Sequence, residues 1–567
     1  MYIEQVPNRG ARPTILLRQS YREGRKVRKR TLANLTHLPA EIIEVISLAL
    51  KGRKLVPCDQ ALAIERSIPH GHVKAVVGTI GKLGLDTIIA SRRSPERDLV
   101  VAMIAERLLH GCSKLASTRL WHTTTLAEEL SVQDADVDEL YQAMDWLLER
   151  QERIEKKLAD RHLTEGGQVL YDVTSSYYEG RTCPLARYGH NRDGKKGHPI
   201  IVYGVLTDSQ GRPVAVDVYP GNTGDPTTVP DQVNKLRQRF GLWRVVLVGD
   251  RGMLTETQIE KLKEYPQLGW ISALRSASIR KLVQNQELQL SLFDRQNLAQ
   301  ITSAEFPGER LVACFNPLLA EERTRKRQEL LAATEQKLRR IAGEAARRTK
   351  KPLTKDQIGV KVGRVINRYK VSKHFDLVIE EGVFRWERNE QSIEREAALD
   401  GIYVIRTSEP AKRLSSEDTV RSYKGLGRVE QGFRCLKGID IRVRPIHHRE
   451  DPRVRAHVFL CLLAYYVEWH MREALKPLLF DDEELTQNRK TRDPVARAEP
   501  SLSARRKKAE RITSDGLPVH SFDTLLQELA TLCRNRCRIH GTPSGTTFIQ
   551  DTEPTPTQAR VFQLLGL

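Results

Sequence analysis

The segment Gln168-Val-Leu-Tyr-Asp-Val-Thr-Ser-Ser176 is a run of apolar, aromatic and β-branched residues with a single acid, Asp172, near its centre. Such a run predicts a buried strand. A carboxylate in a buried strand costs free energy unless it is paired or binds a metal ion. Asp172 is therefore the first candidate for a functional group, and the alternative is an acid that only ends or caps a structural element.

Five strand-like runs begin at this segment and predict a mixed five-stranded sheet with helices, in the α+β fold class. Helical patterns over 228–240 and 255–263 separate the later runs from one another, whereas the turn-rich stretch Asp208-Ser-Gln-Gly-Arg-Pro213 predicts a hairpin between the second and third. The runs are Val169–Val173, Ile200–Leu206, Val214–Tyr219, Val245–Val248 and Trp270–Leu274.

A second acid, Asp250, follows the apolar stretch Arg244-Val-Val-Leu-Val-Gly249 and so lies at the carboxyl end of the fourth predicted strand. Sheets with helical crossovers gather their ligands beyond the ends of their strands. The alternative is an aspartate that caps the next helix.

A third acid, Glu430, lies in Tyr423-Lys-Gly-Leu-Gly-Arg-Val-Glu-Gln-Gly-Phe-Arg-Cys-Leu-Lys437. If this stretch is helical, Tyr423, Glu430 and Lys437 are spaced by seven and share one face, with Arg434 one turn after Glu430. A carboxylate flanked by cations suits a helix that binds a metal ion and a phosphodiester together. The alternative is a solvent-exposed helix with a Glu430–Arg434 pair.

Two aspartates at strand ends and a glutamate on a later helix form the ligand set of two-metal phosphoryl transfer. Mg²⁺ takes hard oxygen ligands, usually one or two carboxylates for each ion. Two such ions stabilise the attacking and the leaving oxygen of a phosphodiester at once.

The composition points to a polyanionic partner. The 567 residues include 92 Lys and Arg against 72 Asp and Glu, a net charge of +20. An excess of this size favours nucleic acid. Eight scattered cysteines, no signal-peptide pattern and no apolar run of about 18 residues favour a protein of the reducing cytosol with no membrane partner.

The rest of the chain divides by pattern into four further segments. Residues 1–54 form a basic, hairpin-like segment, and residues 55–165 a helical, DNA-binding region without a diagnostic helix-turn-helix. Residues 281–399 interrupt the strands and contain a very basic helical stretch, and residues 476–567 combine a basic linker with a helical tail. The hairpin's cations, which either contact DNA or form a solvated face, are Arg25, Lys26, Arg28, Lys29 and Arg30.

Strand-Asp, strand-Asp, a long interruption and Tyr-x6-Glu-x6-Lys together resemble the DDE transposases of bacterial insertion sequences. The resemblance runs from about Tyr171 to Trp469 and is closest to the group with the signature Tyr-x2-Arg-x3-Glu-x6-Lys. One position departs, because Leu426 stands where that group has arginine, and Arg428 or Arg434 is expected to take its role. Family-like stretches are Val218–Asp225, Gly249–Met253 and Asp400–Thr407.

The resemblance implies a ribonuclease H-like core formed by residues 166–280 and 400–475, split by an insertion domain over 281–399. It implies that Asp172, Asp250 and Glu430 are the catalytic and metal-binding triad for Mg²⁺, with Mn²⁺ able to substitute. The expected reaction is cleavage of double-stranded DNA at the inverted-repeat ends of the element and joining of the 3′-OH ends to target DNA, by a homodimer or higher multimer. Expected DNA contacts in the core are Tyr423, Arg428, Arg434, Lys437 and Arg251, and, from the glycine-rich loop 188–198, Arg192, Lys195 and Lys196.

Two alternatives remain open at this point. One is a non-catalytic DNA-binding protein derived from a transposase. The other is a structure-selective nuclease with the same core, which hydrolyses DNA without joining it.

Overall fold

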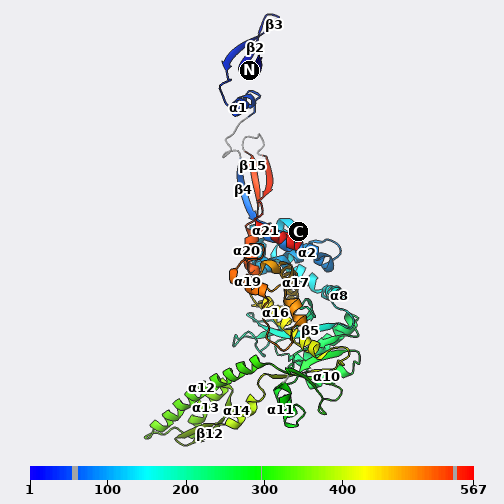
Figure 1. Cartoon of the computed structure of the whole chain (residues 1–567), viewed down its shortest axis with the longest axis vertical. Coiled ribbons are helices and arrows are strands. Elements are labelled where there is room, and N and C mark those ends of the chain that lie inside the picture. Colours follow the sequence, from blue (N-terminus) through cyan, green and yellow to red (C-terminus); the bar gives the residue numbers. More distant parts are fainter. Residues whose placement is uncertain (54–61, 295, 540–545) are drawn as a thin grey trace.

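The computed structural model describes residues 1–53, 62–294, 296–539 and 546–567, and the fold is α+β around one mixed sheet (Figure 1). The predicted boundary between residues 54 and 55 lies outside the described residues.

The main sheet has eight strands, in the order β10-β11-β14-β9-β8-β5-β6-β7. The last five strands in this order, from β9 to β7, are the five predicted runs. They are β5 (Gln168–Tyr177), β6 (Ile200–Asp208), β7 (Pro213–Pro220), β8 (Val246–Val248) and β9 (Gly269–Ala273). Strands β5, β8 and β9 run parallel to one another, whereas β6 is antiparallel to β5 and β7 is antiparallel to β6. The predicted hairpin between β6 and β7 is confirmed, and Gly211 supplies its left-handed turn with φ +83°.

The prediction of five strands was too low, because three further strands extend the sheet beyond β9. They are β14 (Ile402–Thr407), β11 (Arg310–Phe315) and β10 (Leu298–Ile301), all antiparallel. Two of them, β10 and β11, come from the segment 281–399, so the first part of that segment belongs to the main sheet. Pairing with β14 satisfies backbone groups that an exposed β9 edge would leave open.

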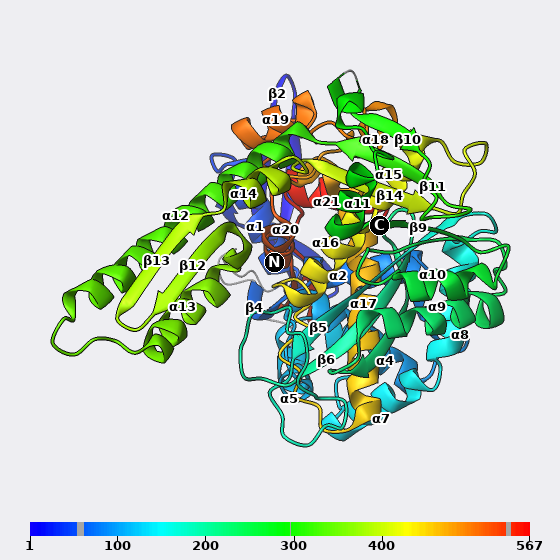
Figure 2. The ribbon, with the colours of Figure 1, turned by 90° about the horizontal axis from the view of Figure 1, so that it is seen from below.

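The remaining part of that segment has a hydrophobic core of its own, separate from the core under the main sheet. Figure 2 shows it extending sideways from the body of the molecule. Its elements are α12 (Pro317–Arg347), α13 (Lys355–Tyr369), the hairpin β12 (Phe375–Glu380) and β13 (Val383–Arg388), and α14 (Glu390–Ala397).

The helices that precede β5 share one core with the sheet and with α17 (Asp451–Leu475). The α17 sequence is apolar on nearly every face between Val454 and Val467, which explains why it is buried there on all sides. The preceding helices are α2 (Gly71–Lys82), α3 (Leu85–Ile89), α4 (Pro95–Leu109), α5 (Lys114–Leu120), α6 (Leu126–Leu130), α7 (Val137–Leu148) and α8 (Gln151–His162). The helices between and after the strands are α9 (Val229–Asn234), α10 (Glu256–Lys263), α11 (Ser276–Gln284), α15 (Ser416–Lys424) and α16 (Leu426–Lys437).

The N-terminal segment is a three-stranded sheet followed by α1 (Ala40–Leu50). Strands β2 (Ala11–Glu23) and β3 (Lys26–Asn34) form the predicted hairpin, and β1 (Tyr2–Asn8) pairs with β2 as a third strand. This unit lies at one end of the long axis, far from the main sheet (Figure 1).

The C-terminal segment contains strands that the sequence pattern did not indicate. Strand β15 (Cys533–Ile539) pairs with β16 (Thr547–Asp551) on one side and with β4 (Leu62–Pro69) on the other. The stretch predicted as a basic linker contains helices, and the chain ends on a helix that packs against α2 and α17. These helices are α18 (Leu485–Thr491), α19 (Leu502–Glu510), α20 (Phe522–Ala530) and α21 (Pro556–Leu565).

Candidate functional site

Asp172 and Asp250 lie at the same level on two neighbouring parallel strands. Leu170 of β5 is paired with Val248 of β8, and each aspartate stands two residues after its member of this pair. Because side chains alternate along a strand, residues two apart share a face, and adjacent strands lie about 5 Å apart. The two carboxylates therefore emerge side by side at the end of β8.

Each aspartate uses one carboxylate oxygen for the local backbone. Oδ1 of Asp172 accepts a hydrogen bond from the Val173 amide at 2.7 Å. Oδ1 of Asp250 accepts from the amides of Gly252 and Met253 at 3.0 and 2.7 Å. In the described ranges, Oδ2 of each aspartate has no hydrogen-bond donor, so each keeps one oxygen for a ligand.

Glu430 reaches the same place from α16, which packs on β5 and on α17. Val429, Phe433 and Leu436 form the buried stripe of this helix, whereas Glu430 is exposed beside it. At Gly432 the helix approaches α17 so closely that an added Cβ would lie 3.0 Å from the Tyr465 ring. The glycine therefore allows the close packing that holds α16 across the sheet.

The predicted helix over 423–437 is two helices, because the chain breaks at Gly425 between α15 and α16. Tyr423 therefore belongs to α15 and does not share a continuous helix face with Glu430. Its phenol still feels the site: burial, together with the charges of Asp250, Glu430 and Asp172, raises the pKa of Tyr423 to about 12. Tyr423 is consequently protonated at neutral pH and can donate a hydrogen bond.

The electrostatics of Asp172 show that the three acids influence one another. Burial, together with the negative charges of Asp250 and Glu430, raises the pKa of Asp172 to about 7. In the part of the chain that the structure describes, none of the three carboxylates forms an ion pair, and the alternative of a Glu430–Arg434 pair is not realised. A cluster of like charges without a counter-ion, built from hard oxygen ligands, fits divalent cations.

A tighter group of possible ligands elsewhere is neutralised by the protein itself. Ligand atoms of Cys435, Asp440 and Glu468 lie within 4.8 Å of one another, which the three acids of the site do not. However, Arg472 contacts Asp440 at 3.1 Å and Glu468 at 2.5 Å. The guanidinium supplies the positive charge there, so this second group is structural.

Lys437 forms part of a polar chain at the end of β5. Its Nζ donates to the Ser175 carbonyl at 2.6 Å and contacts Asp193 Oδ1 at 3.0 Å, and Arg444 contacts the same oxygen at 2.5 Å. Asp193 is almost fully buried, with 2% of its side chain exposed. Asp193 and Arg444 were not identified from the sequence, because nothing local shows that they meet Lys437.

The two arginines considered in place of the family arginine point in different directions. Arg428, two residues before Glu430, lies on the other side of α16 and donates to the Ser209 carbonyl in the β6–β7 turn. Arg434 is exposed one turn after Glu430, and the described residues offer it no ion-pair partner. Only Arg434 is therefore free to contact a phosphate near Glu430.

The other predicted DNA contacts divide by position. Arg192 pairs with Asp225 and lowers the pKa of Asp172 through its charge, which places it close to the acids, whereas Lys195 pairs with Glu179 at 2.5 Å. Lys196 and Arg251 are exposed. All residues of β3 are exposed, so the cations of that strand, from Lys26 to Arg30, and Arg25 in the turn before it, face solvent far from the acids.

No helix in the described ranges is both long and apolar enough to cross a membrane.

Comparisons with known proteins give two family matches. The model for the transposase DDE domain matches residues 165–467, and the model for the N-terminal domain of IS1634 family transposases matches residues 3–57. Among solved structures, a cryo-EM structure of the piggyBac transposase synaptic complex with hairpin DNA is similar, with 10% identity and a TM-score of 0.33 over 81% of this chain and 78% of that chain. No curated protein matches the chain.

Proposed function

Since this chain belongs to the DDE transposases of bacterial insertion sequences and is a DNA transposase, we propose that Asp172, Asp250 and Glu430 are its catalytic carboxylates. The observation that carries the assignment is that Asp172 and Asp250 stand side by side at the end of β8, close enough to Glu430 for their charges to interact, with no ion pair to any described cation. We further propose that the strands and helices around them form a ribonuclease H-like core and that residues 316–399 are its insertion domain.

In this proposal the free oxygens of Asp172 and Asp250, together with Glu430, hold Mg²⁺, for which Mn²⁺ substitutes. A pair of such ions, when bound, stabilises charge on the attacking and leaving oxygens of the phosphodiester. The chain itself positions the DNA: protonated Tyr423 donates a hydrogen bond to a phosphate oxygen, and Arg434 supplies positive charge one turn from Glu430. Lys437 keeps the end of β5 in place through Ser175 and Asp193.

The proposed reaction hydrolyses DNA at the inverted-repeat ends of the element and joins the freed 3′-OH groups to target DNA. The exposed cations of β3 and the helices over 71–162 bind the ends, and the protein acts as a homodimer or higher multimer at nucleoid DNA. The net charge of +20 supports a polyanionic substrate.

The test uses Asp172→Asn, Asp250→Asn and Glu430→Gln in assays of end cleavage and of joining with pre-cut ends in Mg²⁺. Each substitution is expected to lower both rates by about 10³-fold or more, because each removes a charge that the ions require. DNA binding without divalent ions is expected to persist in all three.

The matched control is Glu417→Gln, which neutralises an exposed acid of α15 that has no ion pair in the structure's described part. It should retain wild-type rates. Joining by any of the three site variants at the wild-type rate would reject the assignment. Cleavage without joined products in the wild type would favour the nuclease, and no metal-dependent reaction at all would favour the non-catalytic DNA-binding protein.

A further inference from the structure

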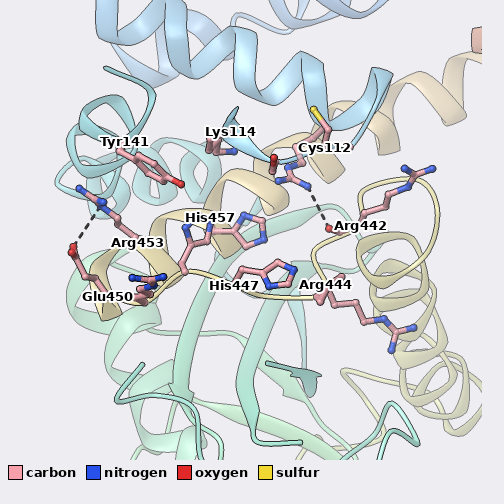
Figure 3. Close-up of a pocket in the computed structure, with 15 residues that line it drawn as sticks. Cys112, Lys114, Tyr141, Arg442, Arg444, His447, Glu450, Arg453 and His457 are labelled. Atoms are coloured by element: carbon pink, nitrogen blue, oxygen red, sulfur yellow. Dashed lines mark hydrogen bonds and ion pairs between the residues drawn. The ribbon is translucent and has the colours of Figure 1, made fainter. Parts of the chain in front are cut away.

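A second charged region lies beyond the C-terminal end of α16. A cavity of about 660 Å³ opens between the loop that joins α4 to α5, the segment 442–453 and the first turns of α17. Figure 3 shows side chains from all three gathered around this space, among them Lys114, His457 and Arg453. The volume lies within the range of small-ligand pockets and exceeds what a single water cluster needs.

The cavity is lined by six cations and one acid. The acid, Glu450, contacts Arg453 at 3.5 Å, and Arg444 is paired with Asp193 outside the cavity. Among the residues described, the other four have no carboxylate partner: Arg107, Lys114, Arg442 and Arg449. Four like charges around one space repel one another unless an anion enters it.

Lys114 is the strongest indication that the cavity binds an anion. The residue is only 4% exposed, and in the described ranges its ammonium has neither a hydrogen-bond acceptor nor an ion-pair partner. Burial, together with the charge of Arg107, lowers the pKa of Lys114 to about 7. A buried ammonium that faces a cavity without an acceptor is expensive, so its presence indicates a ligand that supplies one.

Arg107 shows the same lack of compensation. It is 6% exposed, and its guanidinium donates to the Arg442 carbonyl at 3.4 Å without any acid nearby in an ion pair. Two of the three histidines in the wall add no charge, because burial and the surrounding cations lower the pKa of His448 to about 3 and that of His457 well below its usual value. The positive potential of the cavity therefore comes from its arginines, and Lys114 adds to it when protonated.

The cavity is connected to the strand that carries Asp172. Arg444 in its wall shares Asp193 with Lys437, and Lys437 donates to Ser175, three residues after Asp172. Tyr178, directly after β5, also forms a parallel bridge with Ile446. A polymer that lies on the acids and follows the end of β5 therefore reaches this cavity.

We propose that the cavity binds a phosphodiester group of the DNA whose cleavage the three acids perform, as a second phosphate subsite outside the catalytic centre. This proposal rests on the proposed function for the identity of the polymer. Guanidinium and ammonium groups are the usual partners of phosphate oxygens. A free phosphate has the same chemistry and is the competing occupant.

The experiment measures binding of the full-length protein to a labelled duplex carrying the element's own end, without divalent ions, at several salt concentrations. Lys114→Met and Arg449→Ala are each expected to weaken binding about tenfold and to reduce the slope of log affinity against log salt by about one, as the loss of one phosphate contact should. Arg449 is exposed, so this variant tests the proposal independently of any effect on folding at Lys114.

The matched control is Lys261→Gln, which removes an exposed cation of α10, outside the cavity wall and outside the helices proposed to bind the DNA ends. It should keep the wild-type affinity and slope. A second arm titrates inorganic phosphate and follows thermal unfolding. Unchanged affinity and slope in both cavity variants would overturn the proposal. If, in addition, inorganic phosphate stabilises the wild type but not these two variants, the cavity binds a free anion instead.

Failure of this proposal and failure of the proposed function are distinguishable, because the binding measurement involves no chemistry. Reduced slopes in the cavity variants would stand even if the acids proved not to be catalytic. Conversely, loss of joining in Glu430→Gln would stand if the cavity variants bound DNA normally.

Discussion

The acid site and the basic cavity lie on either side of the polar chain formed by Lys437, Asp193 and Arg444. Both regions contain charges without ion-pair partners, whereas the charges of the chain are paired. At the site, three carboxylates influence one another without a cation in ion-pair range, and around the cavity four cations lack a carboxylate, in the described ranges. Between them, Lys437 and Arg444 share the carboxylate of Asp193. The comparison teaches that charge which the fold leaves unpaired indicates a ligand, whereas paired charge indicates structure.

The surroundings of the two regions explain how the fold tolerates the imbalance. The acids lie where β8 ends and α16 begins to cross the sheet, so backbone amides of Val173, Gly252 and Met253 stabilise part of the aspartate charge. In the cavity, the Arg442 carbonyl does this for Arg107, whereas in the described residues the Lys114 ammonium has no hydrogen-bond acceptor. The metal-free, DNA-free protein therefore carries electrostatic strain in both regions.

The largest effect on stability is expected from breaking the ion-paired chain of Lys437, Asp193 and Arg444 between the two regions. Asp193→Asn leaves Lys437 and Arg444 without their shared carboxylate, and unpairing buried ions typically costs about 3 kcal/mol of the free energy of unfolding. Denaturant unfolding at pH 7 measures it. Glu329→Gln, which breaks the exposed Arg325–Glu329 pair on α12, is the control and should change stability by less than about 1 kcal/mol. An equal change in the free energy of unfolding for the two variants would show that the buried Asp193 ion pairs are worth no more than an exposed pair.

A smaller effect, of opposite sign, is expected from removing the unpaired charge of the cavity. Lys114→Met should stabilise the DNA-free protein by about 2 kcal/mol below pH 7, because an apolar side chain replaces a buried ammonium. The pKa of Lys114 in the folded protein, about 7, lies below its ordinary value of 10.5. The unfolded chain thus binds more protons between these values, and the stability of the wild type rises with pH across that window.

The advantage of Lys114→Met should accordingly be complete below pH 7 and shrink as the pH rises from 7 to about 10.5. The groups whose charge acts on Lys114 are Arg107 and Glu106 from α4, Cys112 before α5 and Cys461 from α17. Thermal unfolding of both proteins from pH 6 to 10 checks the expectation. A variant less stable than the wild type at pH 6 would show that the ammonium is compensated after all.

The smallest effect is expected from adding the counter-ion of the acid site. Mg²⁺ at ten times its dissociation constant should raise the free energy of unfolding by about 1.4 kcal/mol through mass action, because it binds the folded protein. The shift in thermal midpoint on addition of Mg²⁺ measures it, with Asp172→Asn and Glu430→Gln expected to show little or none. Asp440→Asn is the control, since Arg472 already neutralises its group. An equal Mg²⁺ response in Asp172→Asn and in the wild type would place the ion elsewhere.

Five strands of the main sheet, Asp172 within β5, Asp250 directly after β8 and the helical character around Glu430 were predictable from the sequence, because each is encoded by local periodicity. A buried strand has an apolar run wherever it pairs, and an acid inside such a run stands out at once. The single helix expected over 423–437 was wrong, because the chain breaks at Gly425, a residue type that weakens a helix locally.

Partners far apart in the chain were decided only by the tertiary structure. The pairing of β15 with β4 joins residues more than 450 positions apart, and β14 pairs with β9 across the whole interruption. Likewise, no local pattern tells that Arg428 turns to the β6–β7 hairpin, that Lys437 meets Asp193, or that Lys114 and Arg449 face one cavity. Side-chain periodicity specifies which face of an element is buried, whereas which charges end up compensated depends on which elements pack together, and packing is a property of the whole chain.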